Sequence, residues 1–70
     1  MKRIYKLEWY LEREGLLKTK WMSSRKMAER EFEELKKVLK KDCWISIDEY
    51  VERCEEEGFE YGMQIGFTEI

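Results

Sequence analysis

The first apolar segment of the chain alternates between apolar and polar side chains. From Ile4 to Leu11 this alternation has the period of a strand, although Ile4, Leu7 and Leu11 also have the spacing of a helix face. A helix would place basic residues at its N-terminus and Glu12 and Glu14 at its C-terminus, and both placements oppose the helix dipole. The segment is therefore predicted to be a strand.

A tight hairpin is predicted to follow. Arg13-Glu14-Gly15 has the composition of a three-residue hairpin loop that ends with Gly15 in the left-handed conformation. This loop predicts the pairs Leu11 with Leu17, Trp9 with Thr19 and Leu7 with Trp21 on one face, and Glu8 with Lys20 and Tyr10 with Lys18 on the other. Both Trp9 and Trp21 are then expected on the core side.

The most regular helical pattern runs from Ser23 to about Lys40. Ser23 is the expected N-cap, with Met22 and Met27 in the positions of a hydrophobic staple. Apolar residues then recur at spacings of three and four, at Ala28, Phe32, Leu35 and Leu39. Acidic residues precede basic ones along the segment, which is the order that the helix dipole favours.

A second helix is predicted to begin at a capping box. Ser46-Ile47-Asp48-Glu49 has the required spacing, and Ile45 and Tyr50 occupy the staple positions around it. The residues expected to face inward are Ile47, Val51 and Cys54. Gly58 is the expected left-handed cap, so that this helix would end near Glu57.

Residues 59–70 fit two structures. Phe59, Tyr61, Met63, Ile65 and Phe67 alternate with polar residues or glycine, which favours a strand. Glycines four apart at positions 58, 62 and 66 would instead leave Phe59, Met63, Phe67 and Ile70 on one helix face. Two interior glycines would each cost a helix about 1 kcal/mol, so the strand is preferred and the helix is the alternative.

Together these elements predict an α+β fold in a single domain of residues 1–70. Its order is ββααβ, with a three-stranded antiparallel sheet that is covered on one face by two helices. Seventy residues are too few for a second domain.

The composition excludes several classes of protein. Hydrophobic residues make up 43% of the chain and aromatic residues 14%, which excludes general disorder. The chain has no His, and Cys43 and Cys54 match no zinc pattern, so we predict no enzyme, no catalytic residue, no metal and no cofactor. Without a signal-peptide pattern or a long apolar run, a cytoplasmic protein with reduced cysteines is expected.

The net charge of −2 conceals an asymmetry. Residues 1–47 carry a charge of +5, residues 48–60 carry −6, and Glu69 supplies the remainder. The acidic run is predicted to bind a protein partner with a basic surface. Trp44, which precedes the second predicted helix, either closes the edge of the core or is an exposed aromatic anchor for that partner. The predicted contact residues are Asp48, Glu49, Glu52, Glu55, Glu56, Glu57 and Glu60. A merely solvated helix face is the other interpretation.

Two further functions remain open. Basic residues could contact nucleic acid, although the acidic net charge makes this less expected. The candidates are Lys18, Lys20, Lys36, Lys37 and Lys40. The chain could also be a structural subunit, a monomer or a homodimer, that associates through an open sheet edge or Trp44.

Parts of the sequence resemble small proteins of phages and mobile elements. Lys20 to Glu29 (KWMSSRKMAE), followed by Phe32 and Leu35, resembles their hairpin-to-helix join. The small size, the Lys and Glu content and the acidic run also resemble anti-CRISPR and other anti-defence proteins. This resemblance implies a non-catalytic inhibitor that blocks a host defence complex. Residues 59–66 are similar to a helical C-terminal motif of Gram-positive mobile elements, which favours the helical alternative there.

Overall fold

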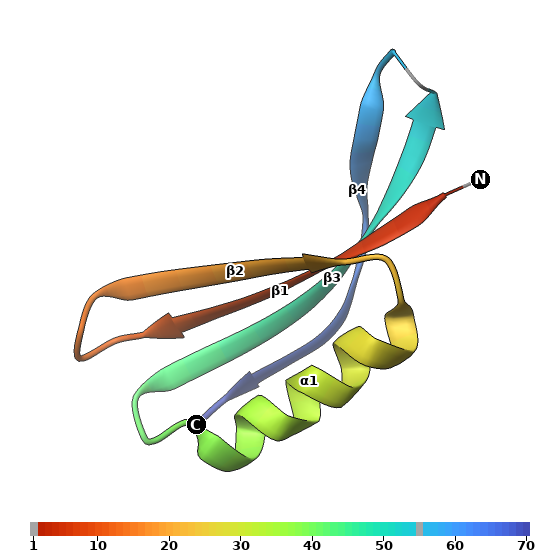
Figure 1. Cartoon of the computed structure of the whole chain (residues 1–70). Coiled ribbons are helices and arrows are strands. Elements are labelled where there is room, and N and C mark those ends of the chain that lie inside the picture. Colours follow the sequence, from red (N-terminus) through yellow and green to blue (C-terminus); the bar gives the residue numbers. More distant parts are fainter. Residues whose placement is uncertain (1, 55) are drawn as a thin grey trace.

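The computed structural model describes residues 2–54 and 56–70 and contains one antiparallel sheet with a helix on one of its faces (Figure 1). The elements in chain order are β1 (Arg3–Leu11), β2 (Leu16–Met22), α1 (Arg25–Val38), β3 (Cys43–Cys54) and β4 (Gly58–Glu69). The strands lie in the order β2-β1-β3-β4, and each neighbouring pair is antiparallel.

The predicted helix at the centre of the chain is confirmed as α1. Its N-cap is Ser24 rather than Ser23, because the Ser24 hydroxyl accepts a hydrogen bond from the Met27 N–H at 3.3 Å. The helix ends at Val38, two residues earlier than expected, and the Leu39 N–H closes its last turn on the Leu35 carbonyl at 2.9 Å.

The predicted second helix is wrong, because residues 43–54 form strand β3 between β1 and β4. The three-stranded ββααβ sheet under two helices is therefore replaced by a four-stranded ββαββ arrangement. Ile45 and Ile47 are fully buried on one side of β3, as a strand period requires. The hydroxyl of Ser46 does not cap a helix but donates to the Asp48 carboxylate at 3.0 Å.

The final segment is strand β4, so the strand prediction is confirmed and the helical alternative is wrong. Gly58 has the predicted positive φ of 72°, but it lies in a hairpin turn and not at a helix end. The register shifts opposite β3 leave Gly62 and Ile65 as extra residues, which is the signature of β-bulges. Gly66 lies opposite Ile47 and against the ring of Phe32 in α1.

The β1–β2 hairpin differs from its prediction by one residue. Gly15 has the expected positive φ, of 63°, but the turn spans residues 12–15 and pairs Leu11 with Leu16. A one-residue slip moves every side chain of a strand to the other face, so Leu17 and Trp21 lie away from α1. All five predicted cross-strand pairs are therefore wrong. They were Leu11 with Leu17, Trp9 with Thr19, Leu7 with Trp21, Glu8 with Lys20 and Tyr10 with Lys18.

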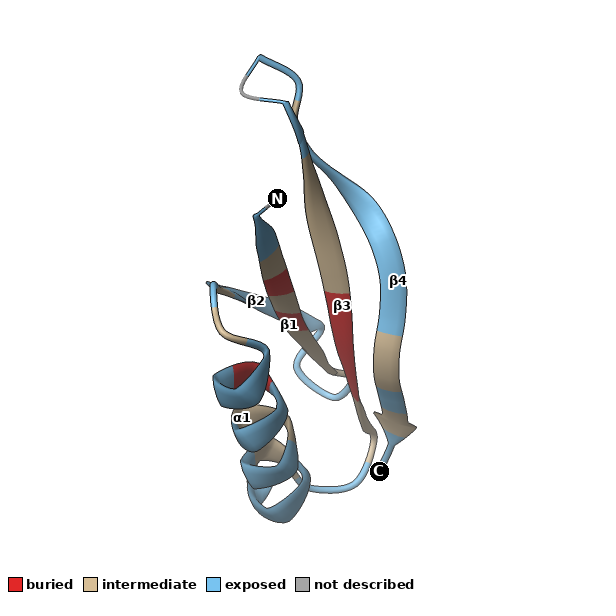
Figure 2. Cartoon of the chain, turned by 90° about the vertical axis from the view of Figure 1, so that its right-hand side faces the viewer, coloured by how far each residue is buried: buried red, intermediate tan, exposed pale blue. Residues whose placement is uncertain are grey.

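The core lies between α1 and the sheet. Its buried apolar residues come from β1, β3 and the start of α1 (Figure 2), and are Tyr5, Leu7, Ala28, Ile45 and Ile47. Around them pack Trp9, Met22, Phe32, Leu35, Leu39 and Ile65, so Trp9 lies on the predicted side. Within the described residues no element covers the opposite face of the sheet (Figure 1).

The two cysteines are free thiols at opposite ends of β3. At about 3.3 Å per residue a strand of this length separates them by roughly 30 Å, far more than a disulfide can span. Among the described residues, the structure contains no helix with the length and apolar character needed to cross a membrane.

Replacement of Gly62 by Ala is expected to destabilise the fold by about 2 kcal/mol, because the new Cβ would lie 2.9 Å from the Glu49 carbonyl oxygen, a backbone atom. Gly66→Ala is the matched control. Its Cβ would lie 3.1 Å from a side-chain methyl group of Ile47, a longer contact than the one to the backbone oxygen at Gly62, so its cost is expected to be smaller. Urea denaturation measures both, and an equal loss in the two variants would contradict the bulge geometry.

Candidate binding surface

The sheet face opposite α1, here called the open face, carries an unusual set of side chains. Residues paired across antiparallel strands share a face, so the strand registers define its members. They are Ile4, Lys6, Glu8 and Tyr10 of β1, Leu17, Thr19 and Trp21 of β2, Trp44, Ser46, Asp48, Tyr50 and Glu52 of β3, and Phe59, Tyr61, Gln64, Phe67 and Glu69 of β4.

Three aromatic rings form a first group, the Tyr50 cluster, which consists of Trp21, Tyr50 and Tyr61. The ring of Tyr50 lies edge-on to Trp21 at 5.0 Å and to Tyr61 at 5.5 Å between centroids. Trp21 is 51% exposed and Tyr61 55% exposed. The cluster is thus ordered by its own contacts and still half open to solvent.

The ammonium group of Lys6 lies over this cluster. Its Nζ is 5.5 Å from the centroid of Tyr50 and 6.0 Å from that of Trp21, and it pairs with the Glu8 carboxylate at 3.8 Å. Burial favours loss of the Lys6 proton, but a hydrogen bond with Tyr50 and the charge of Glu8 outweigh it, so the pKa of Lys6 is raised. Lys6 stays charged over the two rings.

A second group, the Trp44 cluster, consists of Tyr10, Trp44 and Phe67. The Trp44 ring is stacked on Tyr10 at 6.0 Å with 28° between planes, and it lies 5.9 Å from Phe67. Trp44 was expected to precede a helix, but it is a residue of β3 on the open face. It lies at the start of β3, whereas the acidic turn follows the end of that strand.

A polar network separates the two clusters. The Asp48 carboxylate accepts hydrogen bonds from the hydroxyls of Ser46, at 3.0 Å, and Tyr61, at 3.3 Å. The Gln64 side-chain amide donates to the Ser46 hydroxyl at 3.3 Å. Ser46 and Asp48 are 6% and 7% exposed, so the charge of Asp48 is held within the face and does not project from it.

The predicted acidic residues do not share one surface. Asp48 and Glu52 belong to the open face, whereas Glu49 and Glu60 lie on the other side of the β3–β4 hairpin. Glu56 and Glu57 follow β3 in the turn, and Glu55 lies outside the described residues. The described ones all belong to one hairpin, whose tip projects beyond the helix-covered part of the sheet (Figure 1).

Two arginines neutralise the helix side of this hairpin. Arg3 pairs with Glu49 at 3.7 Å, and Arg53 pairs with Glu57 at 3.6 Å and with Glu60 at 2.9 Å. The open face is different, because its strands carry Glu8, Asp48, Glu52 and Glu69 against Lys6 as their one basic residue among those described. The open face therefore carries a larger excess of negative charge than the helix side of the hairpin, where the two arginines face three paired glutamates.

The structure separates the candidate nucleic-acid residues from the exposed aromatic rings. Lys18 and Lys20 lie on the helix side of β2, and Lys20 pairs with Glu31 at 2.8 Å. Lys36 and Lys37 belong to α1 and Lys40 follows it, with Lys36 paired to Glu33 at 3.2 Å. Trp21 was expected on the core side with Lys18 and Lys20 on the other face, and the structure exchanges the two, so Trp21 lies on the open face and both lysines lie on the helix side.

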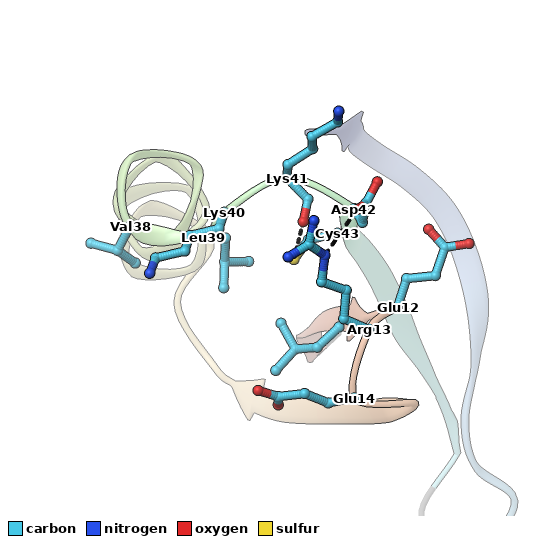
Figure 3. Close-up of a pocket in the computed structure, with 10 residues that line it drawn as sticks. Glu12, Arg13, Glu14, Val38, Leu39, Lys40, Lys41, Asp42 and Cys43 are labelled. Carbon is cyan, nitrogen blue, oxygen red and sulfur yellow. Dashed lines mark hydrogen bonds and ion pairs between the residues drawn. The ribbon is translucent and has the colours of Figure 1, made fainter.

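A hollow of about 610 Å³ lies between the end of α1 and the β1–β2 turn (Figure 3). Across it Arg13 reaches the Asp42 carboxylate at 3.2 Å, while Lys41 points away from that pair (Figure 3). Its charged side chains have both signs, and the Cys43 thiol donates to the Lys41 carbonyl at 4.0 Å. Among the described residues no three Cys, Asp or Glu side chains are placed to hold a metal ion.

The sequence pointed to three members of the open face, Trp44, Asp48 and Glu52, but not to most of its aromatic residues. A signal for them was present, since Trp44, Ser46, Asp48 and Tyr50 alternate with Ile45, Ile47 and other residues of the core side. That alternation places large aromatic residues opposite the core-facing side chains.

The arrangement defines a small ββαββ domain with a single-helix layer and an aromatic, acidic open face. Comparison of the chain with family models, with curated proteins and with solved structures gives no match. Its function is therefore argued from the open face itself.

The phenol of Tyr61 is expected to titrate above the ordinary pKa of 10.0. Partial desolvation and then the charge of Asp48 raise its pKa, because both disfavour the phenolate. The stability that depends on this proton is fully present below pH 10 and is lost as the pH rises through the raised pKa.

Phenolate absorbance of the protein and of the Tyr61→Phe variant, recorded as the pH is raised, isolates this titration. Asp48→Asn should lower its midpoint, because the neighbouring charge is removed. A Tyr61 midpoint at or below the ordinary value would be inconsistent with the hydrogen bond to Asp48.

Proposed function

We propose that this chain is a non-catalytic protein-binding module that docks its open face on the basic surface of a protein partner. The observation that carries the proposal is the combination, on one uncovered sheet face, of two aromatic clusters, in which Trp21, Tyr61 and Phe67 are about half exposed, with an excess of carboxylates. The acidic tip of the β3–β4 hairpin extends the same surface.

The aromatic clusters supply contact area at low entropic cost. Tyr and Trp are enriched among the residues that dominate binding energies, and large rigid rings lose few rotamers on association. Trp21, Tyr61, Phe67 and Leu17 are each about half exposed although they lie on strands of a folded sheet. Their mutual contacts fix the surface before a partner arrives, which reduces the cost of binding.

The charge of the open face selects the class of partner. Its carboxylates would repel nucleic-acid phosphates, and a second copy of the same face would bring like charges together. A protein surface rich in Arg and Lys is complementary both to the carboxylates and to the exposed ring faces. The alternatives of nucleic-acid binding and self-association are correspondingly less favoured.

The resemblance to anti-defence proteins supplies the setting of the proposal. In this setting the module is a phage or mobile-element inhibitor that works in the cytoplasm and blocks a host complex by occupying its basic surface. Complexes that handle nucleic acid present such surfaces, because they must bind phosphate. A small domain without catalytic chemistry suffices to cover one.

Loss of an exposed ring is expected to weaken partner binding at least tenfold, about the effect of one interface hot spot. The test captures partners from host lysate, identifies them, and then measures the affinity of the purified pair for the protein and for Trp21→Ser and Tyr61→Ser. Val38→Ser is the matched control, because Val38 is 69% exposed on α1, away from the open face. Equal weakening by all three variants would contradict docking through the open face.

Charge reversal tests the electrostatic part of the proposal. Glu52→Lys is expected to slow association and weaken binding, whereas Glu34→Lys on α1 should have little effect. Affinity should also fall as salt is raised. Tight binding of DNA or RNA at low salt, lost by Lys18→Glu with Lys20→Glu, would instead favour the nucleic-acid alternative.

A further inference from the structure

A second, smaller pocket lies beside the Trp44 cluster at the end of the sheet where β1, β3 and β4 meet. Its volume is about 270 Å³. The residues around it are Tyr10, Glu12, Asp42, Cys43, Trp44, Glu69 and Ile70, and it is here called the Trp44 pocket. Ligand sites for small molecules are usually larger, at about 300 Å³ and above, so this volume suits a single side chain.

Backbone hydrogen bonds fix the walls of the Trp44 pocket. The Glu12 N–H donates to the Asp42 carbonyl at 3.0 Å, and the Asp42 N–H donates to the Ile70 carbonyl at 2.9 Å. The Ile70 N–H then donates to the Cys43 carbonyl at 2.9 Å. Three segments distant in sequence are thereby tied together, so the pocket is formed before any ligand binds.

The chemistry of the lining is that of a cation site. The rings of Tyr10 and Trp44, stacked on each other at 6.0 Å, lie beside the carboxylates of Glu12, Asp42 and Glu69, and the lining includes no basic residue. Among the described residues neither Glu12 nor Glu69 forms an ion pair. Arg13 pairs with Asp42 at 3.2 Å but is not among the residues that line the Trp44 pocket.

The same face shows an independent case of cation capture. At the Tyr50 cluster, aromatic rings and a carboxylate surround the chain's own Lys6 ammonium, with Nζ 5.5 Å from the Tyr50 centroid and 3.8 Å from the Glu8 carboxylate. The Trp44 cluster has the same two components, ring faces and carboxylates, without a cation of the chain over its rings in the described structure. The open face thus has one cation site filled internally and one left for a partner.

We propose that the Trp44 pocket binds an arginine side chain of the basic partner. A guanidinium group is planar, so it can stack on an indole or phenol ring while its N–H groups donate to carboxylates at the edge. A lysine ammonium is more strongly hydrated and cannot stack. This inference rests on the proposed function and specifies the side chain that the open face recognises.

The test titrates the whole ¹⁵N-labelled chain with N-acetyl-L-arginine amide as the probe. Binding is monitored by NMR through the indole N–H signals of the tryptophans. The Trp44 signal is expected to shift and saturate, with half-saturation at about 10 mM for so small a ligand, while Trp9 shifts little. N-acetyl-L-citrulline amide has nearly the same shape without the charge and should give no saturable shift. N-acetyl-L-lysine amide should bind at least threefold more weakly.

Two matched variants locate the binding. Glu69→Gln, which removes a charge opposite Trp44, should weaken the probe at least fivefold, whereas Glu60→Gln, at the hairpin next to Arg53, should leave it unchanged. Equal shifts with citrulline, equal binding of lysine, or an unchanged affinity in Glu69→Gln would each overturn the arginine site. If the arginine site is refuted but Trp21→Ser still weakens partner binding, the proposed function is supported without it. If Trp21→Ser does not weaken partner binding, the proposed function is itself refuted.

Discussion

The structure depends on the contact between one amphipathic helix and one face of the sheet. Leu7, Ile45 and Ile47 on the two central strands are almost completely removed from solvent by α1, and Ala28 lets the helix approach closely. Burial of this kind is the main favourable contribution to folding. The described residues form one helix and four strands, so the contact that creates the core leaves the other face of the sheet without a covering layer in this part of the chain.

The absence of a second layer explains the composition of that face. A two-sided sheet normally exposes small or charged polar residues to water. Here the rings pack on one another, Lys6 lies over two of them, and Asp48 is enclosed by hydroxyl groups, so the face forms a thin secondary core of its own. The side chains of such a surface are held in place by their mutual contacts, yet part of their apolar area is still exposed to water. This is the physical basis of the docking role that we propose.

Local secondary structure could be predicted from the sequence more accurately than strand register and strand pairing. The periodicity of β1, α1 and β4, and the left-handed glycines at 15 and 58, follow from rules that act within a few residues. The predicted β1–β2 register was wrong because a four-residue turn and a three-residue loop both end on glycine. The resulting shift of one residue places Trp21 on the open face and Lys20 on the helix side. The helix prediction at Ser46-Ile47-Asp48-Glu49 was wrong because this sequence fits both a capping box and an alternating strand. Pairing with β1 on one side and β4 on the other determines that it is a strand.

The bulges at Gly62 and Ile65 have a consequence for behaviour in concentrated solution. Strand β4 forms one rim of the sheet, is twelve residues long, and carries neither proline nor lysine, the usual deterrents to fibril-like growth from an unpaired rim. Each bulge breaks the regular ladder of donors and acceptors that an incoming chain would have to match. The two bulges therefore reduce the tendency of β4 to pair with a strand of another molecule, although exposed aromatic side chains lie on the adjoining face.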